Sequence, residues 1–253
     1  MNVINFLHRF RFIRYIAKRG ARNLTIRQAF YSGSIFLNAV EHSWAWTGGR
    51  TYMTFDRELQ DFLHQESLSH DFLIDIGCNI GVMTVGTLMN NPKIHAVALD
   101  PNRNAIGLLK KTLKYNQLSG RCRVINAAAG THNGKVKFDS GGSVTGHIDE
   151  NGEEVDMIGI ADLLNNYTGR RTLVKVDIEG YESQVVAGLK EVTRLADFTF
   201  LIEFHEYGFN GVGDPQYVLD TMKGLGGKAT DLAGNPVEAI DPAQVSQLVV
   251  RFS

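Results

Sequence analysis

The sequence predicts an α/β protein built on a doubly wound, mostly parallel sheet, with an antiparallel hairpin insertion and a basic helical arm at its N-terminus. Two observations support this fold class. From residue 72 onward, short apolar runs alternate with amphipathic segments, the order typical of parallel strands joined by right-handed helical crossovers. Between residues 130 and 160 the alternation stops and Asn-Gly pairs stand beside extended runs, which indicates hairpins.

The alternating part begins with three apolar runs, which we expect to be strands: FLIDIG (72–77), IHAVALD (94–100) and CRVINAAA (122–129). The segments between them have helical periodicity, over residues 80–90 and 104–118. Because strands and helices alternate along this part of the chain, we expect the strands to form one parallel sheet. The sequence contains no internal repeats.

The second half continues the same order after the hairpin insertion. Its predicted strands are LVKVDIEG (173–180), FTFLIEFHEY (198–207) and QVSQLVVRF (244–252). One helix is expected from about Tyr181. Asp214 and Pro215 combine an N-cap with proline at the first helical position, so a second helix is expected from there to about Gly224.

Length and composition are typical of one large globular domain. The chain has 253 residues, of which 43% are hydrophobic and 21% are charged. We expect a Rossmann-like domain over residues 51–253, preceded by an extension over residues 1–50. No apolar run approaches the roughly 18 residues that a membrane span needs. Cys78 and Cys122 do not form a CxxC pair, which favours a reducing, cytoplasmic setting.

The N-terminal extension is basic, although the net charge of the chain is −1. No carboxylate precedes Glu41, whereas the first 27 residues contain seven basic side chains: Arg9, Arg11, Arg14, Lys18, Arg19, Arg22 and Arg27. Phe6, Phe10, Ile13 and Ala17 recur at helical spacing between them. Two interpretations stay open: a helix lying on an anionic membrane surface at the inner face of the membrane, or a helix packed on the domain or a partner chain.

The stretch FLIDIGCNIGVMTVG (72–86) predicts a ligand-binding turn. Asp75 ends an apolar strand, where a buried carboxylate is costly unless something pairs with it. Gly77 and Gly81 permit a tight turn and a close approach of backbone to ligand. Asp100 ends the next strand, where an acidic residue receives ribose hydroxyls in nucleotide-binding units. Asn79 replaces the second glycine of the dinucleotide fingerprint, which favours an adenosine ligand without a pyrophosphate and disfavours a dinucleotide oxidoreductase.

Further polar residues follow the later strands. In open α/β sheets, ligands bind beyond the carboxyl ends of the strands. The residues expected at this edge are Asp75, Asp100, Asp177, Glu179, Glu203 and His205.

Three blocks in this order resemble the FkbM family of S-adenosylmethionine-dependent methyltransferases: FLIDIGCNIGVMT, AVALDPN and LVKVDIEGYESQVVAGL. The resemblance runs from about residue 70 to about residue 205. It implies a class I, Rossmann-like methyltransferase fold and O-methylation of a hydroxyl on a sugar, glycan or glycosylated natural product. Two positions depart from the family pattern, because Asp100 replaces the usual glutamate and Ala161 replaces the first of two aspartates before the fourth strand, leaving Asp162.

The resemblance also implies roles for individual residues. Those expected to hold the methionine part of the cofactor are Asp75, Gly77, Asn79 and Gly81. Asp100 would bind the ribose hydroxyls, and the residues expected beside the adenine are Asn126, Ala127 and Ala128. Asp177 and Glu179 would lie at the methyl-transfer site, with Lys175 and Glu182 supporting them.

The chemistry of hydroxyl methylation calls for alignment and for a base. A base within hydrogen-bond reach of the acceptor hydroxyl contributes about 10²–10⁴ in rate. Asp177 and His205 are the candidates, with Glu203 in reserve. A magnesium or manganese ion held by Asp177, Glu179 and Glu203 is the alternative.

Several of these residues have a structural interpretation as well. His205 is equally compatible with a hydrogen-bonded core histidine, and Lys175 with a buried ion pair to Asp177 or Glu179. Glu182 also suits the first turn of a helix. The aromatic residues Trp44, Trp46 and Tyr52 are compatible with the core or with stacking on a sugar or base.

Two other functions stay open beside an O-methyltransferase acting on a small-molecule or glycan acceptor. A nucleic-acid methyltransferase would use the basic arm as a phosphate clamp. A non-enzymatic, methyltransferase-like scaffold would bind a partner through the arm. Peripheral membrane contact through residues 1–27 is compatible with the O-methyltransferase function. The acidic balance of the rest of the chain disfavours binding to nucleic acid.

Overall fold

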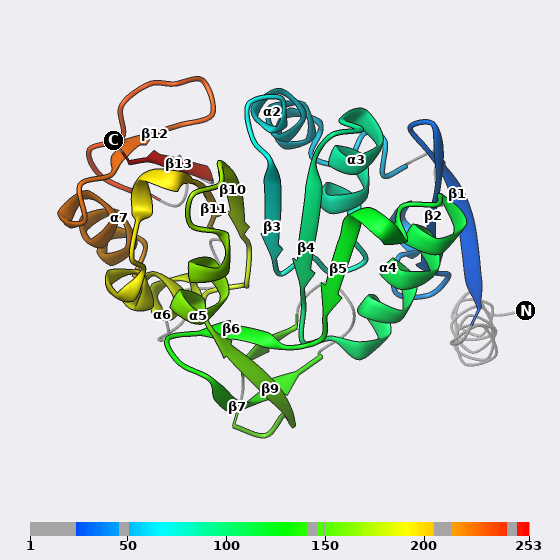
Figure 1. Cartoon of the computed structure of the whole chain (residues 1–253). Coiled ribbons are helices and arrows are strands. Elements are labelled where there is room, and N and C mark those ends of the chain that lie inside the picture. The colour runs from blue at the N-terminus through cyan, green and yellow to red at the C-terminus, as the bar shows by residue number, and fades with distance from the viewer. Residues whose placement is uncertain are drawn as a thin grey trace, which may run out of the picture.

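The structure is a computed structural model that describes residues 24–45, 51–140, 146–148, 150–204, 214–241 and 247–252. These residues form a central seven-stranded sheet, a four-stranded sheet and a two-stranded hairpin (Figure 1). The helices lie on both faces of the central sheet, and the smaller sheets lie outside this layered core.

The central sheet has the strand order β12-β13-β11-β10-β3-β4-β5. The bounds of its strands are β3 (Phe72–Ile76), β4 (His95–Leu99), β5 (Cys122–Ile125), β10 (Thr172–Val176), β11 (Phe198–Glu203), β12 (Lys228–Thr230) and β13 (Gln247–Arg251). Strands β11, β10, β3, β4 and β5 are mutually parallel, and β13 is antiparallel to both of its neighbours. The predicted mostly parallel sheet is confirmed, and its order reverses between β3 and β10, where open α/β sheets bind ligands.

Six α-helices of the described residues cover the sheet. Helices α2 (Arg57–Ser67), α3 (Val82–Asn90) and α4 (Arg103–Tyr115) pack on one face, and α5 (Ile160–Leu164), α6 (Glu182–Ala187) and α7 (Pro215–Gly224) on the other. Successive strand residues point to opposite faces of the sheet. Leu73 and Leu173 pack in the core under α2, α3 and α4, whereas Ile74 and Val174 pack in the core under α5, α6 and α7. Short 3-10 turns complete the chain at Ser43–Ala45, Ser119–Arg121, Asn165–Tyr167, Gly188–Glu191 and Leu195–Asp197.

The predicted antiparallel insertion forms the four-stranded sheet, in the order β6-β9-β7-β8. Its strands are β6 (Ala128–Gly130), β7 (Gly134–Asp139), β8 (His147–Ile148) and β9 (Glu153–Gly159), with β7 and β9 paired antiparallel. The strand expected over 122–129 is divided, since β5 ends in the central sheet at Ile125 and β6 begins the insertion. Asn126 marks this break, because its side-chain amide donates to the carbonyl oxygens of Asp100 and Pro101, each at 2.9 Å.

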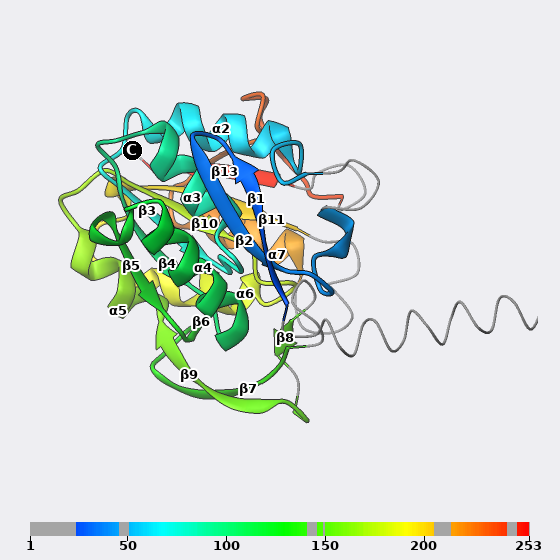
Figure 2. The same cartoon turned by 90° about the vertical axis from the view of Figure 1, so that its right-hand side faces the viewer.

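The hairpin of β1 (Thr25–Phe30) and β2 (Gly33–Asn38) belongs to the extension that precedes residue 51. It packs outside α4, as Figure 2 shows, with Phe30, Ile35 and Leu37 fully buried. Asn116 fastens β2 to the end of α4 by accepting from the Ser34 amide at 3.0 Å and donating to its carbonyl at 2.7 Å. Neither this hairpin nor helix α2 is predicted by the sequence patterns.

Most of the basic arm lies outside the described residues, so its helix and its membrane contact stay predictions. Within the part of the chain that the structure describes, no helix combines the length and the apolar character of a membrane span. Cys78 and Cys122 are not joined by a disulfide bond.

Candidate active site

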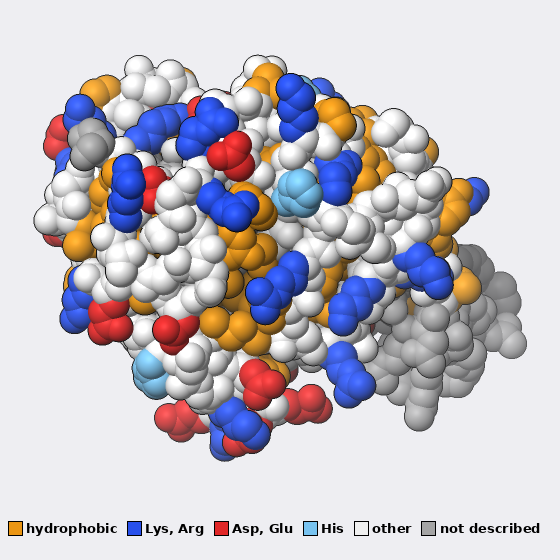
Figure 3. Space-filling model, viewed as in Figure 1, with side chains coloured by type: hydrophobic (Ala, Val, Ile, Leu, Met, Phe, Trp, Pro, Cys, Tyr) orange, Lys and Arg blue, Asp and Glu red, His pale blue; other side chains and the backbone are white. Residues whose placement is uncertain are grey.

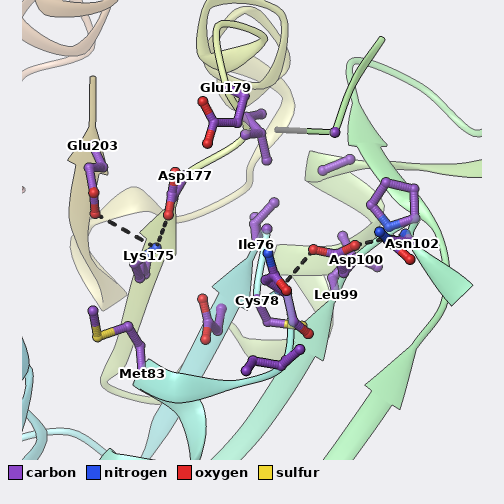
Figure 4. A pocket seen from close by; sticks show the side chains of 18 of the residues that line it. Ile76, Cys78, Met83, Leu99, Asp100, Asn102, Lys175, Asp177, Glu179 and Glu203 are labelled. Atoms are coloured by element: carbon purple, nitrogen blue, oxygen red, sulfur yellow. Dashed lines mark hydrogen bonds and ion pairs between the residues drawn. The ribbon is translucent and has the colours of Figure 1, made fainter. Parts of the chain in front are cut away.

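A cavity of about 490 Å³ opens beyond the carboxyl ends of β3, β4, β10 and β11. The cavity is lined by residues from five regions of the chain: the segment before α2, the turn after β3, the end of β4, the second sheet and the ends of β10 and β11. Figure 4 shows Asp100 and Asn102 on one side of the turn after β3 and Lys175, Asp177 and Glu203 on the other. The predicted edge of the sheet therefore holds the cavity.

The turn after β3 crosses the end of β10 in close contact. Gly77, Asn79 and Gly81 have positive φ angles of 80°, 49° and 83°. A Cβ atom on Gly77 would lie 1.7 Å from the carbonyl oxygen of Asp177, so only glycine fits there. This contact joins the turn to the strand end that carries Asp177.

Asp75 is buried at the end of β3 with an exposed fraction of 1%. Its Oδ2 accepts a hydrogen bond from the Thr84 hydroxyl at 2.5 Å, whereas its Oδ1 has no partner among the described residues. Burial raises the pKa of Asp75, and the positive charge of Lys175 opposes that rise. Because a buried carboxylate oxygen without a donor is costly and this residue lines the cavity, its place fits a donor group of a ligand.

Asp100 directly follows β4, and each of its carboxylate oxygens accepts a hydrogen bond from a backbone amide. Oδ2 accepts from the Asn79 amide at 2.8 Å, and Oδ1 accepts from the Asn102 amide at 2.7 Å. Burial raises the pKa of Asp100 to about 6, although these two hydrogen bonds favour the charged form. Each oxygen retains a second lone pair that a ligand hydroxyl could use.

The raised pKa predicts that binding of S-adenosylhomocysteine weakens in acid. If ribose hydroxyls donate to this carboxylate as predicted, binding favours the ionised form, which is lost as the pH falls below about 6. We expect the dissociation constant to rise by up to about tenfold per pH unit below that value. Calorimetry across this range tests the expectation, and Asp100→Asn should give a much flatter profile. A wild-type profile as flat as that of the variant would contradict it.

The residues predicted beside the adenine divide into two groups. Ala127 and Ala128 are buried and line the cavity. Asn126 is exposed and lies next to the cavity, where it ties the end of β5 to the loop after β4. It is placed to hold that loop in position.

A buried lysine and two carboxylates form the other half of the site. The Lys175 side chain is 3% exposed, and its Nζ lies 2.8 Å from Asp177 Oδ2 and 3.9 Å from Glu203 Oε2 (Figure 4). The attraction of Asp177, Glu203 and Asp75 outweighs burial and raises the pKa of Lys175. Lys175 therefore stays charged beside the Asp177 and Glu203 carboxyl groups.

Strand register brings this cluster together. Lys175 lies opposite Asp75 on β3 and opposite Leu201 on β11. Asp177 and Glu203 each follow by two residues, so they extend from the same face at the next level.

The turn after β10 positions Glu179 and depends on Glu182. Glu179 has a φ of 55°, a left-handed conformation that is uncommon for residues other than glycine. Glu182 is 1% exposed, and its Oε1 accepts from the backbone amides of Ile178 and Gly180 at 3.1 and 3.2 Å. Glu182 thus holds the backbone of this turn in place, and its predicted role in supporting the transfer site stays a prediction.

The described residues do not form the predicted metal set. No group of three or more His, Cys, Asp or Glu side chains in that part of the chain is arranged to hold a metal ion. The Lys175 ammonium already lies between Asp177 and Glu203, where a cation bridging these carboxylates would sit. The donor set does not fit magnesium or manganese. His205 and Trp46 lie outside the described residues.

Several lining residues are not among the predicted site residues. They come from the segment before α2 and from the second sheet: Trp44, Tyr52, Phe55, Asp56, Phe138 and Ile148. The sequence indicates Trp44 and Tyr52 only as aromatic residues with two open interpretations, and no pattern points to Asp56.

Comparison with known proteins bears on the first half of this site. Residues 59–140 match the family model described as the methyltransferase small domain. This segment contains β3, the glycine turn, Asp100 and the start of the insertion. No curated protein sequence matches the chain.

Three solved structures resemble the chain at low identity. The methyltransferase FkbM from Methylobacillus flagellatus KT is 16% identical with a TM-score of 0.49, and the match covers 72% of this chain and 43% of that one. An O-methyltransferase family protein from Burkholderia thailandensis is 10% identical with a TM-score of 0.48, over 85% of this chain and 60% of that one. The methyltransferase PaMTH1 from Podospora anserina, solved with S-adenosylhomocysteine, is 12% identical with a TM-score of 0.48, over 95% of both chains.

The chain thus spans only 43% and 60% of the lengths of the first two of these proteins. At such identities and TM-scores these three structures carry no argument of their own, and the fold assignment rests on the strand order and on the matched family model. The antiparallel β13 beside β11, the glycine turn after β3 and the match over residues 59–140 show a class I methyltransferase fold that carries a methyltransferase domain.

Proposed function

We propose that this chain is an S-adenosylmethionine-dependent O-methyltransferase of the FkbM type, acting on a hydroxyl of a sugar, glycan or glycosylated natural product. One observation carries the proposal: a single cavity is lined by the Asp75 and Asp100 carboxylates and by the Lys175–Asp177–Glu203 cluster, and Figure 4 shows Asp100 across the turn from that cluster. The first group suits a nucleoside cofactor with an ammonium, and the second suits a hydroxyl that must lose its proton.

The cofactor half fits S-adenosylmethionine through the residues already present. The unpartnered Asp75 Oδ1 suits the ammonium of the methionine part, next to the turn of Gly77, Asn79 and Gly81. The Asp100 carboxylate would accept hydrogen bonds from the ribose hydroxyls, and Ala127 and Ala128 would lie beside the adenine. S-adenosylmethionine supplies a methyl group on a sulfonium, which is transferred by in-line displacement.

The other half would position and deprotonate the acceptor. Lys175 holds the Asp177 carboxylate in place by a hydrogen bond of 2.8 Å. Asp177 would accept the hydroxyl proton as the bond between the acceptor oxygen and the methyl group forms. Glu203 and His205 remain the other candidates for this base. The walls of the cavity keep the acceptor near its attack distance, which is the larger part of the catalysis expected for such a displacement.

Substitution of Asp177 tests its role as base. Asp177→Asn keeps the size of the side chain and removes its proton affinity, so we expect methyl transfer to fall by about 10²–10⁴. Binding of S-adenosylhomocysteine should change only a few-fold. Transfer is measured by mass spectrometry on a panel of sugars and glycosides, using any acceptor that the wild type methylates. Asp156→Asn, an exposed change on β9, is the control. Full activity of Asp177→Asn would exclude Asp177 as the base.

Calorimetry tests the cofactor assignment without an acceptor. Wild type should bind S-adenosylmethionine and S-adenosylhomocysteine, and Asp100→Ala should bind both more weakly. Absence of binding by folded wild type would favour the scaffold alternative. Figure 3 shows Lys and Arg side chains spread singly over the face seen in Figure 1, with Asp and Glu among them, rather than gathered in a basic band for nucleic acid.

A further inference from the structure

One wall of the cavity has no part in the roles described so far. It comes from the segment before α2 and consists of Trp44, Tyr52, Phe55 and Asp56, here named the aromatic–carboxylate wall. Its rings form a contiguous cluster, with centroid distances of 4.9 Å between Trp44 and Tyr52, 5.1 Å between Trp44 and Phe55, and 5.7 Å between Tyr52 and Phe55.

Asp56 has an unusual conformation for its place in the fold. It precedes the first residue of α2 with φ 44° and ψ 53°, and its side chain forms no cap of ordinary hydrogen-bond geometry, although the Leu59 amide of α2 favours its charged form by lowering its pKa. Aspartate at such a position ordinarily caps, and left-handed backbone in a residue other than glycine is uncommon. Burial raises the pKa of its carboxyl, and the charges of Lys175 and Asp177 act on it from across the cavity. The wall therefore faces the proposed transfer site.

The charges along the cavity are unequal. Among the described lining residues, Lys175 is the one cationic side chain, against the carboxylates of Asp56, Asp75, Asp100, Asp177, Glu179 and Glu203. S-adenosylmethionine carries a single net positive charge, so the described lining residues keep an excess of acidic over basic groups when it is bound. Such a field attracts cationic ligands and repels anionic ones. Aromatic faces add to the attraction for an ammonium group.

A second observation shows that this acidic cavity is suited to a ligand. Asp75 Oδ1 is buried, lacks a hydrogen-bond partner and belongs to the cavity lining. A donor group in the cavity would satisfy it, and the cofactor ammonium is placed to do so. The wall lies beyond that half, on the side of Asp177.

We infer that the aromatic–carboxylate wall binds the acceptor, and that the acceptor carries a protonated or quaternary amine beside its hydroxyl, as an amino sugar does. The inference rests on the proposed function and narrows its substrate class. Asp56 pairs with the ammonium, the Trp44 and Phe55 rings pack against the apolar face of the acceptor, and its hydroxyl is directed toward Asp177.

The two tryptophans of the chain are Trp44 and Trp46, which gives a direct probe. In a full-length Trp46→Phe protein saturated with S-adenosylhomocysteine, fluorescence excited at wavelengths that tyrosine does not absorb comes from Trp44 alone. Glucosamine, glucose and glucose 6-phosphate are titrated as matched cationic, neutral and anionic probes. We expect the fluorescence to respond to glucosamine with a dissociation constant about tenfold lower than for glucose, and to respond least to the phosphate.

A pair of variants isolates the carboxylate. Asp56→Asn removes the charge and keeps a residue that tolerates left-handed backbone, so the fold should persist and the tenfold preference should vanish. Glu58→Gln, an exposed change on the same helix, should leave the preference intact. An equal response to all three probes, a response to none, or an unaltered preference in Asp56→Asn would overturn the inference. Calorimetric binding of S-adenosylhomocysteine, measured beforehand, separates these outcomes from a failure of the proposed function.

Discussion

Gly77→Ala should unfold the site and much of the domain with it. The new Cβ would lie 1.7 Å from the Asp177 carbonyl oxygen, in a backbone with φ of 80°. That carbonyl belongs to the end of β10, which is held by the hydrogen bond from the Asp177 amide to Ile76 at 3.0 Å. Relief requires separating β3 from β10, so we expect a loss of more than about 3 kcal/mol in the free energy of unfolding. Urea unfolding measures this loss.

A matched glycine separates the clash from the backbone strain. Gly234 has a similar φ of 89°, and a Cβ there would meet nothing within 4 Å. Gly234→Ala should cost only about 1–2 kcal/mol, the penalty of left-handed backbone. The amount by which the loss in the free energy of unfolding for Gly77→Ala exceeds that for Gly234→Ala measures the contact between the turn and β10. Equal losses in the two variants would show that this contact does not constrain the turn.

Lys175→Met should destabilise the folded protein by about 3–5 kcal/mol at neutral pH, because it leaves buried carboxylates without their cation. Lys175 is 3% exposed and lies beside Asp177 and Glu203, with Asp75 opposite it on β3. Without the ammonium, the neighbouring carboxylates repel one another in the folded state, and protonation relieves that repulsion. Stability is then retained in acid, where they are protonated, and is lost as the pH rises.

The measurement is urea unfolding of wild type and variant at about pH 7.5 and about pH 5.5, with the larger difference expected at the higher pH. Lys135→Met is the control, since Lys135 pairs with Glu154 at 2.7 Å but both side chains are 62% exposed. Solvent screens that pair, so its removal should change little. A loss for Lys175→Met that is independent of pH would mean that packing, rather than charge, accounts for its effect.

The glycine turn and Lys175 act on the same part of the site. The turn brings the proposed cofactor-binding residues against the end of β10, and Lys175 stabilises the carboxylates that lie there. The close contact between the turn and Asp177 means that cofactor and base cannot move independently. A substitution that shifts β10 should therefore weaken cofactor binding as well as transfer.

Asp177, the proposed base, forms an ion pair with Lys175, and this pairing affects how proton removal can contribute to the rate. The Lys175 ammonium lies 2.8 Å from Asp177 Oδ2, so a proton taken up by this carboxylate competes with the ion pair. Alignment of acceptor and donor would then supply more of the rate than proton removal.

Local patterns in the sequence predicted six of the seven strands of the central sheet, and the three-residue strand β12 was missed. The run around Leu73 and Ile76 is apolar throughout because parallel strands are buried on both faces, and Asp214 with Pro215 indicates the start of α7 by chemistry within a few residues. The strand expected over 122–129 was wrong in its length, because Asn126 bonds to the loop after β4 and ends β5 early. The hairpin β1–β2 and α2 were missed because their burial depends on α3 and α4, which a local pattern does not show.

By itself the sequence determined the α/β order, the glycine turn and the identity of the residues at the carboxyl ends of the strands, since each depends on neighbours along the chain. The tertiary structure alone decided that Lys175 lies between Asp177 and Glu203, and that Asp56 and the rings of Trp44 and Phe55 join the same cavity. Those contacts join residues far apart in the chain. They follow from strand register and from the packing of α2, which only the folded chain sets.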